Sequence, residues 1–592
     1  METIKVLNSP KIKYLILLLV FQSLCFNSIA QTFTKIITGP LVSTNGDSRS
    51  VNWIDVNNDG FIDCFISNGP QGGQNNMLYI NNGAGGFTAV ANDTIVKDNQ
   101  PSDGATWADC DNDGDLDCYV VNWYNTSNLF YTNDGSGTFT KVPGIINTSG
   151  GYCETASWGD YDDDGLVDLY VTNSAGVNKN LLYHNDGNNS FTKITTGDAV
   201  NDIADSRCVN WTDMDADGDP DLFVTNESNQ NENIYRNDGG GAFTKLTSGA
   251  LANDGGKTMS AAWADYDNDG DMDVFLANDQ GNDGLFRNDG NFNFIKITAD
   301  TVSNCGGNSF SSAWSDIDND GDLDLFVTNS FWAATLLENF LFLNNGNGTF
   351  TRVSNTAPAT DLDWSYGCAF GDYDNDGFED LAVATCRFNS IDRPDLLYHN
   401  DGNSNHWITI KLVGNPTNKA AIGTKIKIKA IINGLPVWQM REISAQTSYC
   451  GQNDLRAHFG LGNGTVVDSV KVEWLSGTIE FYANVSFDQF ITITEGQGIT
   501  GMNENKQNDG IHIFPNPATG IVTIKISNHQ LQPGDKITIT NVLGETEKEF
   551  AVQSASEKFE INLKELKAKG NGLLYFSVYS KSGLLTRKVL KM

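Results

Sequence analysis

The chain is poor in the residues that carry out acid–base and nucleophilic chemistry. Of its 592 residues only six are histidine, the side chain that enzymes use most often for proton transfer. No Ser-His-Asp pattern, nucleophile elbow or phosphate-binding loop occurs, and no Cys-x-x-Cys pair suggests zinc. These absences leave little support for catalysis.

Basic residues are also scarce. Lys and Arg number 38 against 74 Asp and Glu, which gives a net charge of −36. Nucleic acid binding needs a basic face to meet the phosphates, so this charge argues against a nucleic acid partner. Aromatic residues make up 10% of the chain, and the sequence is strongly periodic, which argues against an acidic disordered chain.

Long apolar runs are limited to one at the N-terminus. Lys11 and Lys13 precede "YLILLLVF", and "SIA" at 28–30 fits a small-x-small cleavage site. The run is too short for a membrane span. Residues 1–30 are therefore predicted to be a signal peptide, and we expect an exported protein with no transmembrane segment after cleavage.

The most informative stretch that is present is "DCDNDGDLD", which starts at Asp109. Asp109, Asp111, Asp113 and Asp117 occupy positions 1, 3, 5 and 9 of a loop whose sixth residue is glycine. Alternating carboxylates before a sharp turn surround a hard cation with oxygen ligands, and Ca²⁺ accepts six to eight of them. An EF-hand would need glutamate at position 12 and a helix, but position 12 is Val120, within an apolar strand. The spacing predicts a calcium loop between two strands.

The same nonamer occurs seven times, with starts 51 to 56 residues apart. In every copy position 12 is apolar and an aromatic residue stands two places before the first aspartate. A single acidic nonamer could be a solvated turn, but seven in register favour a repeated metal loop. The first aspartates are Asp55, Asp109, Asp160, Asp213, Asp265, Asp316 and Asp372.

The rest of each unit reads as strands. One strand leads into the loop, and a strand such as "LFVTN" follows it. A third strand ends in an Asn-Asp-Gly hairpin signal, and a fourth opens with Phe-Thr. Four-stranded sheets repeated radially are β-propeller blades, whereas stacked solenoids use shorter repeats and amphipathic helices. We predict an all-β protein in which residues 31–403 form a seven-bladed β-propeller with calcium loops.

The order of the strands predicts how the ring closes. A Phe-Thr-type strand at Phe33 precedes the first loop, and none follows the seventh. We infer that residues 33–37 supply the outer strand of the last blade. The alternative is that "HWITIKL", which starts at His406, occupies that place.

The repeats resemble the FG-GAP or VCBS repeats of integrin α-subunits and of many bacterial surface proteins. The resemblance implies that each loop binds calcium, up to seven ions in all, through the side chains at positions 1, 3, 5 and 9 and the backbone carbonyl at position 7. The implied ligands are Asp55, Asn57, Asp59, Phe61 and Asp63; Asp109, Asp111, Asp113, Asp115 and Asp117; Asp160, Asp162, Asp164, Leu166 and Asp168; Asp213, Asp215, Asp217, Asp219 and Asp221; Asp265, Asp267, Asp269, Asp271 and Asp273; Asp316, Asp318, Asp320, Asp322 and Asp324; and Asp372, Asp374, Asp376, Phe378 and Asp380. Asn57 replaces an aspartate in the first loop, which we expect to be the weakest site.

Two further domains follow the ring. "NHWITIKLVG", "HFGLG" and "VEWLSG" resemble the ASPIC/UnbV domain of cartilage-acidic-protein-like surface proteins, over residues 404–497. His458 in "HFGLG" is expected to be a packed structural histidine rather than a ligand or base. A Gly- and Asn-rich linker is predicted at 498–510. Residues 511–592, with "IFPNPATGIVTIKI", resemble the type A sorting domain of type IX secretion, which implies a small β-sandwich and transport across the outer membrane.

Nine cysteines remain after removal of the signal peptide. Export permits disulfides, but an odd number leaves at least one thiol unpaired. Buried free thiols are at least as well supported as bridges. The best candidate pair is Cys153 with Cys208, which precede neighbouring loops.

Taken together, the sequence favours a calcium-binding surface protein that binds a glycan or protein ligand, with the type IX secretion machinery as its export partner. The alternatives are a calcium-dependent polysaccharide lyase or hydrolase and a structural spacer in a surface layer. We expect the ligand on the face opposite the calcium loops, where irregular connections carry large side chains suited to binding hot spots. These are Trp123, Tyr124, Phe331, Trp332 and Arg387.

Overall fold

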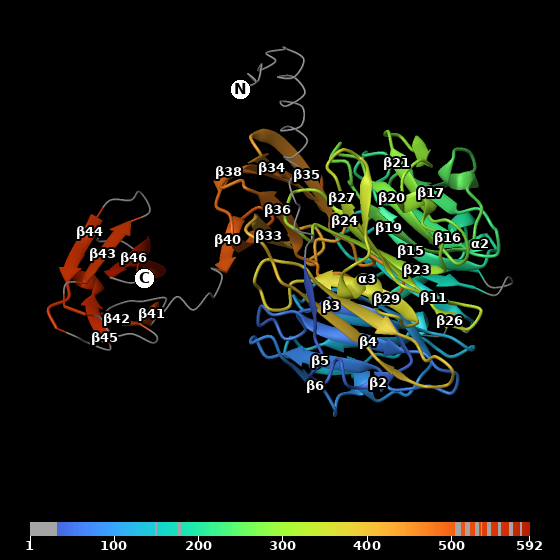
Figure 1. Ribbon diagram of the computed structural model, residues 1–592, viewed down its shortest axis with the longest axis horizontal. Helices are drawn as coiled ribbons and strands as arrows, with labels where there is room; N and C mark the ends of the chain where they lie inside the picture. Colours follow the sequence, from blue (N-terminus) through green and yellow to red (C-terminus); the bar gives the residue numbers. More distant parts are fainter. Residues whose placement is uncertain are drawn as a thin grey trace, which may run out of the picture. The chain divides into compact units, whose positions relative to one another are not determined.

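The computed structural model describes residues 32–147, 151–174 and 179–503, and of the C-terminal region 511–514, 521–526, 532–533, 535–541, 546–554, 558–566, 572–580 and 583–591. The predicted signal peptide lies outside the described residues. The chain divides into two compact units, Met1–Met502 and Asn503–Met592. Strands dominate both units (Figure 1).

The first unit contains a ring of seven four-stranded antiparallel sheets. The innermost strands are β3 (Ser48–Ile54), β7 (Ser102–Ala108), β11 (Cys153–Gly159), β15 (Ser206–Thr212), β19 (Thr258–Ala264), β23 (Ser309–Ser315) and β29 (Ser365–Gly371). The second strands are β4 (Asp63–Asn68), β8 (Asp117–Asn122), β12 (Asp168–Asn173), β16 (Asp221–Asn226), β20 (Asp273–Asn278), β24 (Asp324–Asn329) and β30 (Asp380–Thr385).

The third and fourth strands complete each sheet. The third strands are β5 (Met77–Asn81), β9 (Leu129–Asn133), β13 (Leu181–Asn185), β17 (Asn233–Asn237), β21 (Gly284–Asn288), β27 (Phe340–Asn344) and β32 (Leu396–Asn400). The outer strands are β6 (Phe87–Ala89), β10 (Phe139–Lys141), β14 (Phe191–Ile194), β18 (Phe243–Leu246), β22 (Phe294–Ile297), β28 (Phe350–Val353) and β1 (Phe33–Lys35). Each inner strand contacts the next, from β3 through β29 and back to β3, so the sheets close into a β-propeller.

The N-terminal strand closes the ring. Phe33 in β1 pairs with Asn400 in β32, in the sheet that contains β29 and β30. The predicted closure is confirmed. The alternative strand at His406 is β33 (His406–Val413), which pairs instead with β36 (Ala457–Gly462) and β39 (Gln489–Thr494).

The aromatic residue before each loop joins neighbouring blades. Trp211 is buried, and its indole Nε1 donates to the carbonyl of Ser157 in the preceding blade at 3.3 Å. A Cβ on Gly159 would lie 2.5 Å from that indole, so glycine is needed for the close approach. Trp314 repeats the arrangement with Ala262 at 3.0 Å. Blade-to-blade packing therefore follows from the Trp-x-Asp pattern.

Short elements occupy the connections between blade strands. They are β2 (Asn45–Gly46), which pairs with β31 (Arg393–Pro394); the hairpin β25 (Phe331–Trp332) and β26 (Thr335–Leu336); and the helical turns η1 (Thr94–Val96), η2 (Ile145–Asn147), α2 (Asp198–Asn201), η3 (Leu251–Asn253), η4 (Val302–Asn304) and α3 (Ala357–Thr360).

Residues 404–503 form two further four-stranded sheets on one core. Their other strands are β34 (Lys425–Ile432), β35 (Leu435–Glu442), β37 (Val467–Glu473), β38 (Ile479–Val485) and β40 (Gly498–Asn503). The linker begins later than predicted, because residues 498–503 form the edge strand β40. The Gly-rich composition concealed this strand, whose Ile499 packs against the shared core.

The connection between β35 and β36 forms a plug, residues 443–456, within the ring. Gln452 exchanges backbone hydrogen bonds with β3: its N–H donates to Val51 at 3.0 Å, and its carbonyl accepts from Trp53 at 3.1 Å. The Gln452 side chain accepts from the Trp107 N–H at 2.9 Å and donates to the Trp107 carbonyl at 3.2 Å. One buried glutamine thus joins two blades.

Other plug residues reach the remaining inner strands. Asn210 of β15 donates to the Gln446 carbonyl at 2.9 Å, and Ser448 donates to the Cys368 carbonyl of β29 at 2.7 Å. Tyr449 donates its hydroxyl to Glu154 of β11 at 2.9 Å. The plug therefore holds blades together from the inside, and no repeat or motif in the sequence predicted it.

All nine cysteines of the described residues are free thiols, and eight are buried. The suggested Cys153–Cys208 bridge is wrong. Cys153 begins β11, whereas Cys208 is the third residue of β15, two places beyond the equivalent Ser206. Cys153 packs with Tyr119 and its neighbours, while Cys208 packs near the plug. These thiols act as small apolar side chains.

The second unit consists of a three-stranded and a four-stranded sheet that share one apolar core. Its elements are β41 (Ile511–Phe514), β42 (Ile521–Ile526), β43 (Lys536–Asn541), β44 (Thr546–Ala551), β45 (Lys558–Asn562), η5 (Leu563–Glu565), β46 (Gly572–Ser580) and β47 (Gly583–Lys591). Two sheets on one core form a β-sandwich.

Replacing Gln452 with alanine tests the plug. The Gln452→Ala variant leaves the Trp107 N–H and carbonyl buried without partners, which should lower the free energy of unfolding by about 1–3 kcal/mol. Urea unfolding at fixed calcium measures it. The exposed Gln497→Ala is the matched control, expected within about 0.5 kcal/mol of the native chain. Equal stability of the two variants would contradict a stabilising plug.

Candidate functional site

The seven acidic loops share one backbone conformation. Asp213, at position 1, accepts hydrogen bonds from the N–H groups of Asp217 and Gly218 at 3.1 and 3.0 Å. Position 4 is left-handed in every loop, with φ from 56° to 61°, and the glycine at position 6 has φ from 87° to 106°. Asparagine tolerates the first conformation and glycine the second, which explains the recurring Asn-Asp-Gly. Two loops depart from asparagine at position 4: the third has Asp163 and the fourth has Ala216.

The position 9 aspartate connects its loop to the third strand. Asp221 is fully buried, and its carboxylate accepts from the N–H groups of Met214 and Asn237 at 2.9 and 2.8 Å. The Asn237 side chain then donates to the carbonyl of Tyr161, in the preceding loop, at 2.8 Å. The equivalent asparagine does the same in all seven blades. The loops are thus linked in a circle.

Carboxylates at positions 1, 3 and 9 converge in three of the loops. In the second, third and fourth loops, one oxygen from each of these three residues lies within 4.8 Å of the other two. In six loops the Oδ1 atom at position 3 is buried and has no hydrogen-bond partner. These orphaned atoms belong to Asp111, Asp162, Asp215, Asp267, Asp318 and Asp374. A cluster of oxygen acceptors without donors fits a hard cation.

The first loop differs in the way that the sequence predicted. Its position 3 residue, Asn57, donates its amide to Asp59 at 3.2 Å and has no orphaned oxygen. The side-chain amide of Asn57 therefore satisfies one carboxylate oxygen within its own loop.

Burial and mutual repulsion disfavour ionised carboxylates in the loops. Burial raises the pKa of Asp109 and of Asp117 to about 7, and nearby Asp111 adds to both shifts. The pKa of Asp273 rises to about 9 for the same reasons. A bound cation would reverse these shifts, because an opposite charge favours the ionised form.

Two histidines of the third strands lie beside the acidic loops. The same strand position holds other residue types in the other blades, so the repeat pattern gave no signal for it. In the structure His184 Nε2 lies 3.1 Å from Asp162, and His399 Nδ1 lies 3.1 Å from Asp380. The hydrogen bond to Asp380 raises the pKa of His399 to about 9. Knowing that the third strand runs beside its own loop would have revealed these contacts.

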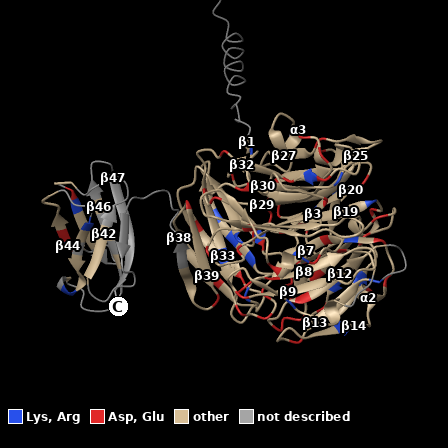
Figure 2. Cartoon of the chain, turned by 90° about the horizontal axis from the view of Figure 1, so that it is seen from below, with Lys and Arg blue, Asp and Glu red and all other residues tan. Residues whose placement is uncertain are grey.

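Residues 404–503 cover the loop side of the ring. Lys425 Nζ donates to Asp213 in the fourth loop at 2.8 Å, and Arg456 donates to Asn375 in the seventh at 3.0 Å. The Gly460 N–H donates to Asp316 in the sixth loop at 3.0 Å. Basic residues of these strands gather beside β33 where they meet the acidic ring (Figure 2). The covering domain is therefore positioned by the loops themselves.

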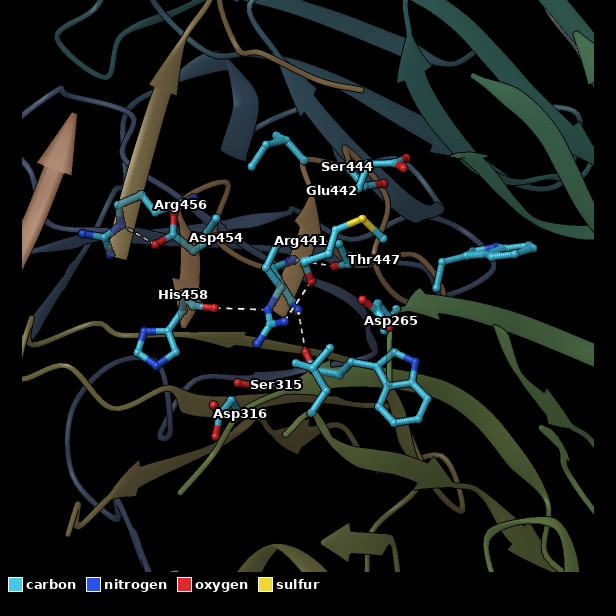
Figure 3. Close-up of a pocket in the computed structure, with 18 of the residues that line it drawn as sticks. Asp265, Ser315, Asp316, Arg441, Glu442, Ser444, Thr447, Asp454, Arg456 and His458 are labelled. Carbon is cyan, nitrogen blue, oxygen red and sulfur yellow. Dashed lines mark hydrogen bonds and ion pairs between the residues drawn. The ribbon is translucent and has the colours of Figure 1, made fainter. Parts of the chain in front are cut away.

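A small polar cavity of about 120 Å³ lies in this seam (Figure 3). Its walls include Arg441, Asp454 and His458 from the covering domain and Asp265 and Asp316 from the fifth and sixth loops. At about 30 Å³ per water molecule, it has room for only a few waters. This volume lies below the range of about 300–1,000 Å³ that small-molecule sites have.

His458 acts as a structural residue in this seam. It is buried, and its ring nitrogens lie 2.6 Å from Asn319 Oδ1 and 3.0 Å from Thr409 Oγ1. Burial and the charges of Arg441 and Arg456 lower its pKa to about 3. A histidine that stays neutral and has both nitrogens occupied matches the expected packed role.

The opposite side of the ring carries the predicted ligand residues. Trp123 and Tyr124 follow β8, and their rings stack edge to face with Tyr152 at centroid distances of 5.9 Å. Trp123 also donates its indole N–H to Glu154 at 3.0 Å. Phe331 packs against Trp364 at 5.0 Å. Trp332 is 58% exposed and has no such ring contact within the part of the chain that the structure describes. Arg387 pairs with Asp392.

The sequence analysis did not predict a cluster of charged side chains on this side of the ring. Arg207 pairs with Glu154 at 2.7 Å and Glu227 at 2.6 Å, and Arg49 lies 4.8 Å from the ring centroid of Tyr366. Arg49, Glu154, Arg207 and Tyr366 occupy the second position of inner strands, where residue type varies from blade to blade, whereas Glu227 follows β16. The repeat pattern alone therefore does not show that charged side chains gather at this strand position.

Comparison with known proteins identifies the repeats. The model described as FG-GAP-like repeat matches residues 55–120, 109–171, 160–224, 213–276, 265–327 and 331–383, more than half of the chain. The chain belongs to the FG-GAP-like repeat family. The ASPIC and UnbV model matches residues 414–500, and the secretion system C-terminal sorting domain model matches 512–592.

Similarity to individual proteins is weak. Cartilage acidic protein 1 of Xenopus tropicalis is 26% identical over 267 residues, which cover 44% of this chain and 40% of that protein. The mouse protein of the same name is 25% identical over 265 residues, covering 43% and 40%. The matched region thus spans less than half the length of these relatives.

Similarity to solved structures is also weak. BBS1N in complex with ARL6DN is 10% identical with a TM-score of 0.37, over 62% of this chain and 97% of that one. A Lactobacillus plantarum protein is 14% identical with a TM-score of 0.36, over 53% and 85%. Scores this low add no argument about function.

The sorting domain assigns the location. It directs the chain through the type IX secretion system to the cell surface. Among the described residues, no helix has the length and apolarity needed to cross a membrane.

Chelation should destabilise the protein in a pH-dependent way. Without metal, several loop aspartates hold protons up to about pH 7 in the folded chain but release them near pH 4 when unfolded. The free energy of unfolding should therefore fall between about pH 4 and pH 7 in chelator, and saturating calcium should remove this loss. Calcium at a hundredfold excess over Kd adds about 2.7 kcal/mol per site. Melting curves across this range test both effects; identical curves with and without calcium would contradict the metal assignment.

The first loop should gain affinity from a single added carboxylate. Asn57→Asp restores the orphaned position 3 oxygen and should tighten the weakest calcium site several-fold. Calcium titration calorimetry measures it. Asn347→Asp, on an exposed hairpin, adds the same charge outside any loop and should leave every site unchanged. Equal calcium affinity of the Asn57→Asp and Asn347→Asp variants would show that the net charge of the protein sets the affinity, not a carboxylate placed in the loop.

Proposed function

We propose that this exported protein is a calcium-stabilised binding module, whose propeller presents a glycan or protein ligand site on the side opposite the loops. The observation that carries the proposal is the cover over the loop side. Contacts such as Lys425–Asp213 and Gly460–Asp316 occupy that side. The connections on the other side remain available.

Calcium would be held by the residues at positions 1, 3, 5 and 9 of each loop. The six orphaned carboxylate oxygens support this assignment, and so does the convergence of three carboxylates in a loop. When bound, calcium supplies positive charge to buried carboxylates that repel one another. Its role in this proposal is structural: it fixes the ring on which the ligand face is built.

Exposed apolar side chains support the ligand face. Ile203, Trp332, Leu362 and Ile391 are between 53% and 60% exposed, and all four lie in connections on the side opposite the loops. Single exposed apolar residues are common, but several on the same side of the ring are consistent with an interaction surface there.

Removing the sorting domain tests the export part of the proposal. A chain ending at residue 510 should fail to reach the cell surface, because the machinery would no longer recognise it. Its ring should still bind calcium, since the second unit has its own core. Surface labelling of cells measures export, and calcium titration checks the ring. Normal surface levels of the shortened chain would contradict the sorting role.

Radical footprinting tests the binding face. The purified calcium-loaded protein is screened against glycan and protein arrays and then footprinted with its best ligand. We expect protection at Tyr124, Tyr152 or Trp332 and none at Trp438 or Phe481 in the covering domain, which are 44% and 65% exposed. Protection of the covering domain alone would contradict the proposed face, and the absence of any ligand would favour a structural spacer.

A further inference from the structure

A groove on the side opposite the loops lies between the fifth and sixth blades. It has a volume of about 680 Å³ and is lined by Trp332, Leu336, Leu337, Glu338, Arg352 and Leu362, among others. This volume lies within the range of small-molecule sites, about 300–1,000 Å³. No loop aspartate lines it, so it is separate from the metal centres.

The groove is built by a hairpin that departs from the repeat. β25 and β26 are inserted between the second and third strands of the sixth blade, and Ala333 and Ala334 form the turn with φ of 48° and 65°. Successive residues of a strand point to opposite sides. Phe331 accordingly packs on Trp364 and Phe388 at 5.0 and 5.4 Å, while Trp332 lines the groove.

Trp332 offers an unoccupied aromatic face. It is 58% exposed, and Leu362, which also lines the groove, is 53% exposed. Burying an indole of this size is strongly favourable, since aromatic side chains bury about 150–250 Å² each. An exposed indole beside leucines therefore favours a ligand with an apolar surface.

Both a free cation and a free anion line the same groove. The Arg352 guanidinium lies 4.3 Å from the Phe340 ring centroid, which fixes its position. Among the described residues, no hydrogen bond or ion pair engages the side chain of Arg352 or of Glu338. A charged ligand would be repelled by one of them, whereas a neutral ligand with hydroxyl groups can accept from Arg352 and donate to Glu338.

We propose that this groove binds a neutral oligosaccharide. A pyranose ring presents C–H groups on one face, which pack on an indole, and hydroxyls at its edge, which suit Arg352 and Glu338. Trp332 is the stacking platform, and Leu362 adds apolar surface to the groove. The inference rests on the proposed function and narrows it to one ligand class and one place on the ring.

Binding of neutral hexasaccharides tests the proposal. Maltohexaose, cellohexaose, mannohexaose and chitohexaose are titrated into the calcium-loaded full-length exported protein, with oligogalacturonate and a peptide array as the charged and peptide arms. We expect at least one neutral hexasaccharide to bind. Trp332→Ala should weaken it about tenfold or more, and Trp332→Phe should retain most of the affinity.

Matched variants separate the groove from the rest of the surface. Glu338→Gln and Arg352→Gln should each weaken the neutral sugar about three- to tenfold, because each removes a charge-assisted hydrogen bond. Trp438→Ala removes a comparably exposed indole from the covering domain and should change nothing. Melting temperatures confirm that every variant is folded.

Three outcomes would overturn the proposal. Neutral sugar binding that is unchanged in Trp332→Ala would place the site elsewhere. Binding of oligogalacturonate or peptides alone would make the ligand class wrong, while the proposed binding function would stand. Failure of every probe to bind would overturn both.

Discussion

The structure depends on how seven clusters of carboxylates are held at the ends of the inner strands. Each loop uses the backbone N–H groups available to it, as Asp213 does with Asp217 and Gly218. Those N–H donors do not satisfy every carboxylate oxygen, and six oxygens at position 3 remain buried without a hydrogen-bond partner. The asparagine contacts between neighbouring loops link the blades in a circle, and the covering domain lies on these loops. The proposed calcium supplies the missing positive charge.

The same constraint explains the local sequence. A left-handed residue at position 4 and a glycine at position 6 turn the backbone so that its N–H groups face the carboxylates, which accounts for Asn-Asp-Gly. The asparagine that ends the third strand fixes position 9 and reaches the preceding loop. Features this local could be predicted from sequence, and so could the role of Phe33 in closing the ring, because the count of strands required it.

Features that depend on contacts between domains could not be predicted. Gln452 and Tyr449 have no periodic partner in the sequence, yet they connect blades from inside the ring. Lys425 and Gly460 look like ordinary strand residues until the covering domain lies on the loops. Trp332 and Phe331 are adjacent and chemically similar, and only the hairpin geometry separates the exposed ring from the packed one.

Direct location of calcium tests the account most sharply. Anomalous scattering from crystals grown in calcium should show an ion about 2.3–2.6 Å from the position 3 carboxylate of the six loops with orphaned oxygens. Asp215 and Asp318 are among them, one loop contacted by Lys425 and the other by Gly460. The first loop should show the weakest peak. Water molecules in place of ions at those six oxygens, in crystals saturated with calcium, would contradict the central claim.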